Sequence, residues 1–147
     1  DRVNGFLDGL GDSKDKCEIV AQQDGGAALD KSMELAEDII TASPDMDAFF
    51  CINDPSALGA AAAIKAANKT GKIGVYSIDA SPDGKQALLD DEFTAVACQV
   101  PVQIADYSFK EAVKYVDGDT KIDEKKVYLD SHLVSKDEAE KTLKEWQ

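Results

Sequence analysis

Three apolar stretches of the chain each end in a polar side chain that can hydrogen-bond a small molecule. The three polar residues are Asn53, Asp79 and Gln99. In open α/β sheets, ligands bind in the crevice outside the carboxyl ends of the strands. An aspartate only accepts hydrogen bonds, whereas the amides of asparagine and glutamine both donate and accept them. The three positions therefore predict a site for a small polar molecule.

The residues that follow two of these positions resemble helix starts. Asp54-Pro55 and Ser81-Pro82 each offer an N-cap residue and a proline at the first helical position. Asn53 and Asp79 are then not needed as caps. Their side chains are expected to face a ligand.

The periodicity of apolar residues predicts alternating strands and helices around this site. Strands are expected at 17–21, 48–52, 73–78, 94–98 and 127–134. Helices are expected at 3–10, 30–42, 55–67, 82–89, 101–116 and 136–146. This order predicts an α/β fold with a doubly wound, mostly parallel sheet flanked by helices.

Composition limits the class of partner. The chain has 147 residues, a net charge of −13 and a sequence pI near 4.3. This charge repels nucleic acid phosphates and anionic membrane surfaces, so neither partner is expected. No apolar run is long enough to insert into a bilayer. The sequence begins without Met or a targeting segment, and it is expected to start within a longer gene product.

The residues that usually carry catalysis are sparse. His132 is the sole histidine, and no Cys or carboxylate lies at metal or dyad spacing from it in the sequence. Cys17, Cys51 and Cys98 form an odd set, and because Cys51 and Cys98 lie within apolar strands we expect inert core thiols there. No glycine-rich phosphate loop follows a strand. We therefore expect no catalytic residue, no metal and no cofactor. A small α/β enzyme using Asp79 as a base is a weak alternative.

Four short motifs along the chain resemble the periplasmic sugar-binding proteins of ABC importers, in their ribose-binding type. They are Arg2-Val3-Asn4-Gly5-Phe6, Thr41-Ala42-Ser43-Pro44-Asp45 before a strand ending in Asn-Asp, Asp79-Ala80-Ser81-Pro82-Asp83-Gly84, and Gln99-Val100-Pro101. Their order and separations match that family.

The resemblance implies two α/β lobes that close on a monosaccharide or related polyol. It implies that Arg2, Asn53, Asp79 and Gln99 hydrogen-bond the sugar. It also implies an extracytoplasmic location, in the periplasm or on the cell surface as a lipid-anchored protein, and the membrane subunits of an importer as partners. One departure is Asp24-Gly25-Gly26-Ala27, which stands where ribose binders have an aromatic residue.

On this alignment the chain is a fragment. Residues 1–99 would form part of the C-terminal-type ligand-binding lobe, residues 100–126 a crossover segment that belongs to the other lobe, and residues 127–147 a returning strand and C-terminal helix. The first lobe and the opening strand and helix of the second lobe are missing from this alignment. An apolar sheet edge is therefore expected to be exposed.

Alternatives remain open from the sequence alone. The chain also fits the effector-binding core of a lactose-repressor-type transcription regulator. A signal peptide or lipoprotein cysteine before Asp1 would favour the binding protein, and a helix-turn-helix would favour the regulator. Each ligand residue also has a structural alternative: a surface ion pair for Arg2, a loop contact for Asn53, a turn for Asp79 and backbone contacts for Gln99.

Overall fold

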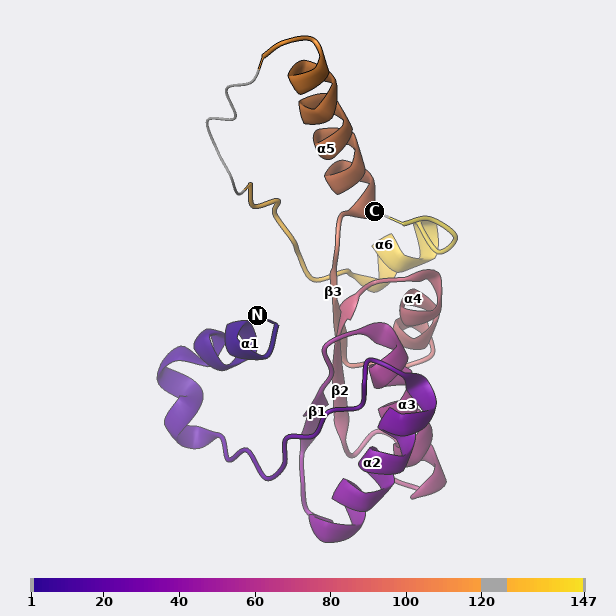
Figure 1. Ribbon diagram of the computed structural model, residues 1–147. Helices are drawn as coiled ribbons and strands as arrows, with labels where there is room; N and C mark the ends of the chain where they lie inside the picture. The colour runs from indigo at the N-terminus through magenta and orange to yellow at the C-terminus, as the bar shows by residue number, and fades with distance from the viewer. Residues whose placement is uncertain (1, 120–126, 147) are drawn as a thin grey trace.

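The computed structural model describes residues 2–119 and 127–146 (Figure 1). Helices and strands alternate through most of this part of the chain. In order they are α1 (Arg2–Gly9), the 3₁₀ helix η1 (Gly11–Lys16), α2 (Leu29–Ala42), β1 (Ala48–Phe50), α3 (Asp54–Ala66), β2 (Gly74–Asp79), α4 (Pro82–Leu89), β3 (Ala95–Cys98), α5 (Pro101–Val116) and α6 (Lys136–Lys141).

The three strands form one parallel sheet in the order β1-β2-β3. Phe49 pairs with Val75, and at the carboxyl end of the sheet Asp79 pairs with Cys98. The α/β class and the parallel sheet are confirmed. Because all three strands run the same way, the residues that follow them lie along a single edge.

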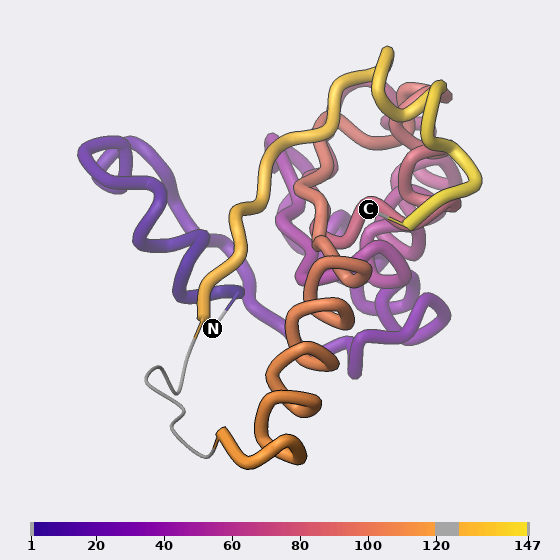
Figure 2. Tube along the Cα trace, turned by 90° about the horizontal axis from the view of Figure 1, so that it is seen from above, coloured from indigo at the N-terminus to yellow at the C-terminus, as the bar shows by residue number. Residues whose placement is uncertain are grey.

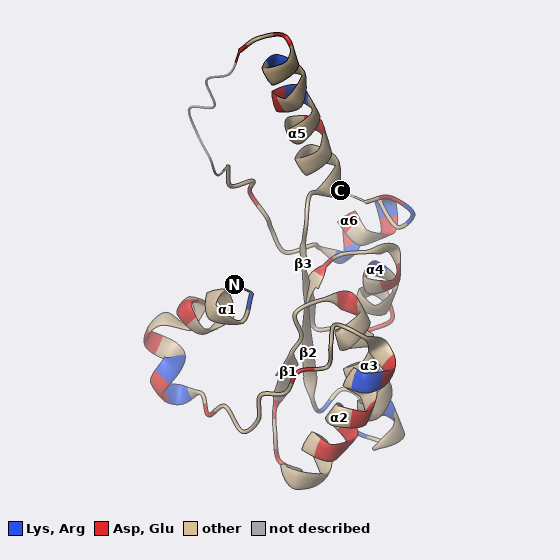
Figure 3. Cartoon of the chain, in the orientation of Figure 1, with Lys and Arg blue, Asp and Glu red and all other residues tan. Residues whose placement is uncertain are grey.

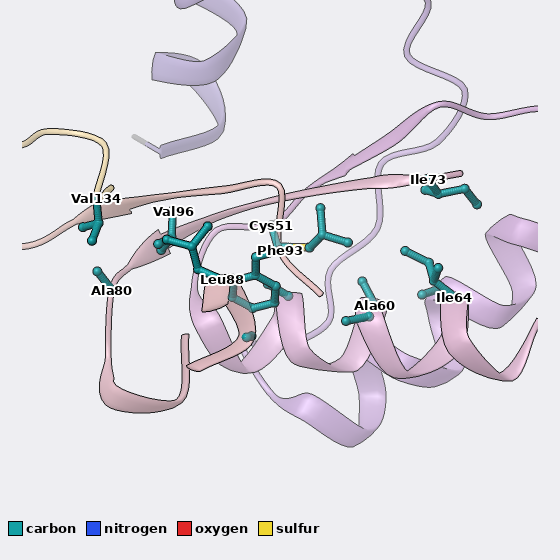
Figure 4. Close-up of a cluster of buried hydrophobic side chains, with 14 of the residues drawn as sticks. Cys51, Ala60, Ile64, Ile73, Ala80, Leu88, Phe93, Val96 and Val134 are labelled. Atoms are coloured by element: carbon teal, nitrogen blue, oxygen red, sulfur yellow. The ribbon is translucent and has the colours of Figure 1, made fainter. Parts of the chain in front are cut away.

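Helices lie on both sides of this sheet. Figures 1 and 2 place α1 and η1 on the side opposite α2, α3 and α4. On the α1 side, the rings of Phe6 and Phe50 stack with centroids 4.3 Å apart. On the other side, buried residues of α3, α4 and the strands form the core, including Ile64, Leu88 and Val96 (Figure 4).

Alanines and one glycine allow α3 to approach its neighbours closely. Ala57 and Ala63 are fully buried on this helix. A Cβ atom built on Gly59 would lie 2.4 Å from the carbonyl oxygen of Leu29 and 2.8 Å from the amide nitrogen of Met33. A side chain at position 59 would therefore push α2 away from α3.

Two predicted strands do not form as expected. Residues 17–21 make no strand, although Ile19 and Val20 are apolar and about half exposed. In a common doubly wound sheet, the first strand lies between the second and the third. If residues 17–21 correspond to the second strand and β1 to the third, the strand that would lie between them is not among the described elements.

The predicted strand 127–134 is reduced to a short antiparallel contact with β3. Ala97 and Leu133 form an isolated bridge. The amide of Cys98 donates to the carbonyl oxygen of His132 at 2.9 Å, and the amide of Val134 donates to that of Val96 at 3.0 Å. The last helix is also shorter than predicted, since α6 ends at Lys141.

The amphipathic helix α5 projects away from the sheet (Figure 1). None of its residues is buried, and Phe109 and Val116 are 70% and 83% exposed. Among the helices that the structure describes, none combines the length and the apolar character that crossing a bilayer requires.

Candidate binding site at the carboxyl ends of the strands

Asp79 lies at the centre of a polar cluster at the end of β2. A nitrogen of the Arg2 guanidinium, Nη1, is 3.0 Å from Asp79 Oδ1. The side-chain amide of Gln99 donates to the same oxygen, and the backbone amide of Gln99 donates to the carbonyl oxygen of Asp79 at 3.1 Å. The structure therefore brings three of the four predicted ligand residues together.

Arg2 connects this cluster to the neighbouring strand. Its Nη1 also donates to the carbonyl oxygen of Ile52, which follows β1. The side chains of Arg2 and Asp79 are 36% and 15% exposed. One arginine at the start of α1 thus spans the ends of two strands while part of its guanidinium still meets solvent.

Asn53 has two structural roles: it caps α3, which was not predicted from the sequence, and it contacts the loop at Ala27, an alternative that the sequence left open. It is the N-cap of α3, and its Oδ1 accepts from the backbone amide of Ser56 at 3.1 Å. Its Nδ2 donates to the carbonyl oxygen of Ala27 at 3.2 Å. The prediction that Asn53 is not needed as a cap is wrong, because Asn53 takes the capping position one residue earlier than expected.

Asp54 is accordingly not a cap but a buried residue inside α3. Its carboxylate accepts from Ser77 Oγ at 2.6 Å, from the Ser81 amide at 2.7 Å and from Ser81 Oγ at 2.6 Å. Ser81 is the N-cap of α4 as predicted, since its side chain accepts from the Gly84 amide at 3.1 Å. Apart from its position after Asn53, no sequence feature indicates that this carboxylate is buried.

The backbone around Asp79 is strained. Asp79 has φ 132° and Ala80 has φ 55°, in the left-handed region that non-glycine residues rarely adopt. Such residues cost on the order of 1–3 kcal/mol each and cluster at functional sites. The turn after β2 is therefore held in place by its surroundings.

A cavity of about 780 Å³ adjoins part of the cluster. Arg2 and Gln99 line it, whereas Asn53 and Asp79 are not among its lining residues. The other walls come from α5 and from residues 127–131, including Tyr107, Glu111 and Tyr128. Tyr107 and Glu111 were not predicted as site residues, because the sequence pattern of an amphipathic helix does not show which cavity its side chains line.

Three polar residues that follow the predicted strand 17–21 lie away from this cluster. Gln22, Gln23 and Asp24 line a second cavity of about 520 Å³, between the segment before α2, helix α1 and strand β1. Asp24 Oδ1 accepts from the Gly26 amide at 2.8 Å, as in an ordinary turn. This second cavity is lined mostly by apolar side chains, so it does not extend the polar cluster.

His132 has a cysteine and a carboxylate close by in space, despite their distance in sequence. Its Nε2 is 2.8 Å from Glu138 Oε1, while Cys98 Sγ lies 3.3 Å from Nδ1 and 3.9 Å from Nε2. A thiol in line with the Nδ1 lone pair would lie much farther from Nε2, so Sγ rests over the face of the ring. The three side chains therefore do not form a nucleophile and base pair.

The remaining thiols fit a structural role only in part. Cys51 is buried, and burial raises the pKa of its thiol to about 12. Cys98 is also buried, as expected for the two cysteines of the apolar strands, whereas Cys17 is exposed. Within the described ranges, no three His, Cys, Asp or Glu side chains are grouped to hold a metal ion.

Basic residues are dispersed in the part of the chain that the structure describes. They are spread over α1, η1, α2, α3, α4, α5 and α6 rather than gathered on one face (Figure 3). In the cluster at the end of β2, Asp79 and Gln99 offer hydrogen-bond acceptors, and Arg2 and Gln99 offer donors. This combination suits a neutral polyhydroxylated molecule.

Two curated relatives are named as binding proteins for ribose or allose. A ribose import binding protein of Salmonella typhimurium is 33% identical over 104 residues, covering 71% of this chain and 35% of that protein. A D-ribose/D-allose-binding protein of Pseudomonas aeruginosa is 32% identical over 124 residues, covering 84% of this chain and 38% of that protein. These matches cover little more than a third of the relatives' length.

Solved structures show the same similarity in three dimensions. A galactofuranose binding protein superposes with a TM-score of 0.87 and 30% identity over 97% of this chain and 49% of that one. A Caulobacter myo-inositol binding protein, solved with myo-inositol bound, gives a TM-score of 0.85 and 26% identity over 95% and 47%. The chain therefore spans about half the length of these structures.

The family described as periplasmic binding protein domain matches residues 1–120. This match covers more than half of the 147 residues. The fold expected from the sequence, part of one lobe of a type I periplasmic binding protein, agrees with the parallel sheet and with the superposed structures. The chain belongs to the periplasmic binding protein domain family.

Proposed function

We propose that the complete protein binds a monosaccharide or related polyol between two lobes and delivers it to an ABC importer. The observation that carries this proposal is the cluster of Arg2, Asp79 and Gln99 at the carboxyl ends of parallel strands. Each of these side chains has polar groups left over for a sugar hydroxyl, which both donates and accepts. The relatives named for ribose and allose support a sugar as the ligand.

Asp79, Gln99 and Arg2 are the proposed direct ligands, and Asn53 is a weaker one. The Asn53 side chain already bonds Ser56 and Ala27, so it would contact a sugar only through its second oxygen lone pair or its second amide hydrogen. Hydrogen bonds to charged groups contribute about 1.5–3 kcal/mol each. Arg2 and Asp79 would therefore supply most of the polar binding energy on this lobe.

The chain would divide between two lobes. In this proposal residues 1–99 form part of the ligand-binding lobe, residues 100–126 cross to the other lobe, and residues 127–147 return. The apolar side chains of α5, such as Val102, Phe109 and Val116, support this division because they are largely exposed in the described structure. The first lobe would cover them and close the site by a hinge motion.

The same proposal includes an extracytoplasmic location and the membrane subunits of an importer as partners. Binding would involve no covalent step, so the protein would not be an enzyme. The geometry of Cys98 and His132 supports this, because the thiol is not aligned with a ring nitrogen. The import binding proteins among the relatives favour this function over the transcription regulator.

Calorimetric titration of the full-length protein with D-ribose, D-allose, D-galactose and myo-inositol tests the proposal. We expect saturable binding to at least one of them with a Kd in the low micromolar range or tighter, which corresponds to about −8 kcal/mol. The absence of heat with every sugar in the panel would contradict sugar binding and favour the regulator.

A further inference from the structure

Asp54 follows β1, and its buried carboxylate hydrogen-bonds residues at the end of β2. The residue is 1% exposed. One carboxylate oxygen accepts from Ser77 on β2, and the other accepts from the amide and the hydroxyl of Ser81. Burial raises the pKa of Asp54, while the hydrogen bonds from Ser77 and Ser81 lower it.

These contacts enclose the strained turn that carries Asp79. Ser77 precedes Asp79 by two residues and Ser81 follows it by two residues, so Asp54 holds the chain on both sides. The two positive φ angles, 132° at Asp79 and 55° at Ala80, lie between these anchors. Without the anchors the turn would relax toward ordinary backbone angles and carry the Asp79 carboxylate with it.

Gly84 provides the space for the Asp54 carboxylate. A Cβ atom built at this glycine would lie 2.1 Å from Asp54 Oδ2 and 2.4 Å from Asp54 Cγ. Gly84 lies inside α4, where glycine lowers helix stability relative to alanine. Its φ is not positive, so the turn geometry does not require it. The glycine of the motif Asp79 to Gly84 is therefore explained by the carboxylate that it accommodates.

We infer that Asp54 is a positioning residue, which does not touch the sugar but fixes the Asp79 carboxylate in its binding geometry through Ser77 and Ser81. This inference rests on the proposed function, because it assigns Asp54 a role in the proposed sugar site. It also predicts an energetic coupling between Asp54 and Gly84 that can be measured without any sugar.

The test is a double-mutant cycle in the full-length protein with Asp54→Ala, Gly84→Ala and the two together. Asp54→Ala is expected to lower Tm because it leaves a void and unpaired donors at Ser77 and Ser81. Gly84→Ala is expected to lower Tm because its methyl group clashes with the Asp54 carboxylate. The alanine methyl at position 84 fits the space left by the carboxylate, so the double variant is expected to regain part of the loss. Additive losses in Tm would contradict the steric pairing.

Affinity for D-ribose, D-allose and myo-inositol separates positioning from stability. The double variant is expected to bind at least tenfold more weakly than the wild type despite its recovered Tm. Asp54→Asn retains an oxygen for Ser81 and a polar group for Ser77, and it is expected to rescue affinity to within a few-fold. Asp83→Ala, which removes an exposed carboxylate on α4, is the matched control and should leave affinity unchanged. Wild-type affinity in the double variant would overturn the inference.

Two further measurements test the role of Asp54. If the wild type binds none of the three compounds, the proposed function fails for them. The amide chemical shifts of Asp79 and Ala80 then test the role of Asp54: they should move in the double variant, and unchanged shifts would overturn that role.

If the double variant does not fold, Ser77→Ala removes one anchor and should weaken binding several-fold. Wild-type affinity and unchanged shifts in Ser77→Ala would overturn the inference.

Discussion

The buried carboxyl group of Asp54 gives the free energy of unfolding a pH dependence that an exposed aspartate would not. Burial, as the largest cause, raises its pKa in the folded state. As pH rises above about 4, the usual pKa of an aspartate, the unfolded state loses the Asp54 proton first. Stability from this group is thus complete below the unfolded pKa and declines as pH rises through the folded pKa.

Asp54→Asn should remove this contribution. Urea unfolding of wild type and variant across the acidic range should show the wild type losing stability relative to Asp54→Asn as pH rises, by about 1.4 kcal/mol for each pH unit inside the titration window. A constant difference between the two proteins at every pH would show that Asp54 does not titrate with a raised pKa.

At the scale of elements, the contact between α2 and α3 depends on the missing side chain of Gly59. A Cβ atom there would lie 2.4 Å from a backbone oxygen, which cannot move as a flexible side chain can. Gly59→Ala should therefore destabilise the protein by about 1–3 kcal/mol through overpacking. Chemical denaturation of both proteins measures the difference.

Gly5→Ala is the matched control for this substitution. Gly5 lies inside α1, and a Cβ atom there would meet nothing within 4 Å. Alanine should stabilise this helix by up to about 1 kcal/mol. Equal effects at positions 5 and 59 would contradict the role assigned to close helix packing.

The contact between α4 and α6 depends on Lys85. This lysine is fully buried, and its ammonium donates to the carbonyl oxygens of Thr142 and Glu145 at 2.8 and 2.7 Å and to Thr142 Oγ1 at 3.1 Å. A lysine at a helix C-terminus satisfies carbonyls that the helix itself leaves open.

Lys85→Met keeps most of the aliphatic stem and removes these donors. We expect a loss of about 2–4 kcal/mol, because the buried ammonium no longer donates its three hydrogen bonds to Thr142 and Glu145, together with faster amide exchange in α6. Lys31→Met, at an exposed position of α2, should change stability by less than about 0.5 kcal/mol. Unchanged exchange in α6 of the Lys85 variant would contradict this role.

Elements with a strong local signal were predictable from sequence. The helix Pro82–Leu89 was predicted with its observed bounds, because Ser81-Pro82 supplies its N-cap and first position. The strands failed where pairing depends on a distant partner. Residues 17–21 have the composition of a strand, but pattern alone does not show that no adjacent edge is available to them.

The placement of the candidate residues was predicted in part for a similar reason. Parallel strand ends place Asp79 and Gln99 together, and the structure bears this out. The sequence could not distinguish Asn53 from Asp54 as the cap of α3, because either residue type fits that position. Asp54 is buried where it accepts hydrogen bonds from Ser77 and Ser81, and Asn53 therefore takes the cap position.

At the scale of the whole molecule, the proposal makes this chain one part of a protein with two lobes. The exposed residues of α5 and the cavity beside Arg2 and Gln99 are where the proposal expects contacts with the rest of the other lobe. The 147-residue chain alone should therefore bind sugar at least tenfold more weakly than the full-length protein, since half of the hydrogen-bond partners would be lost. Equal affinities in parallel titrations would contradict a site shared between two lobes.

Asp79 is the residue on which the proposed site depends, because Arg2 and Gln99 both bond its carboxylate. The most direct measurement is calorimetric titration of full-length wild type, Asp79→Ala and Asp83→Ala with whichever of D-ribose, D-allose, D-galactose and myo-inositol the wild type binds. Asp79→Ala should abolish measurable binding while Asp83→Ala binds as the wild type does. Wild-type affinity in Asp79→Ala would show that the sugar site lies elsewhere.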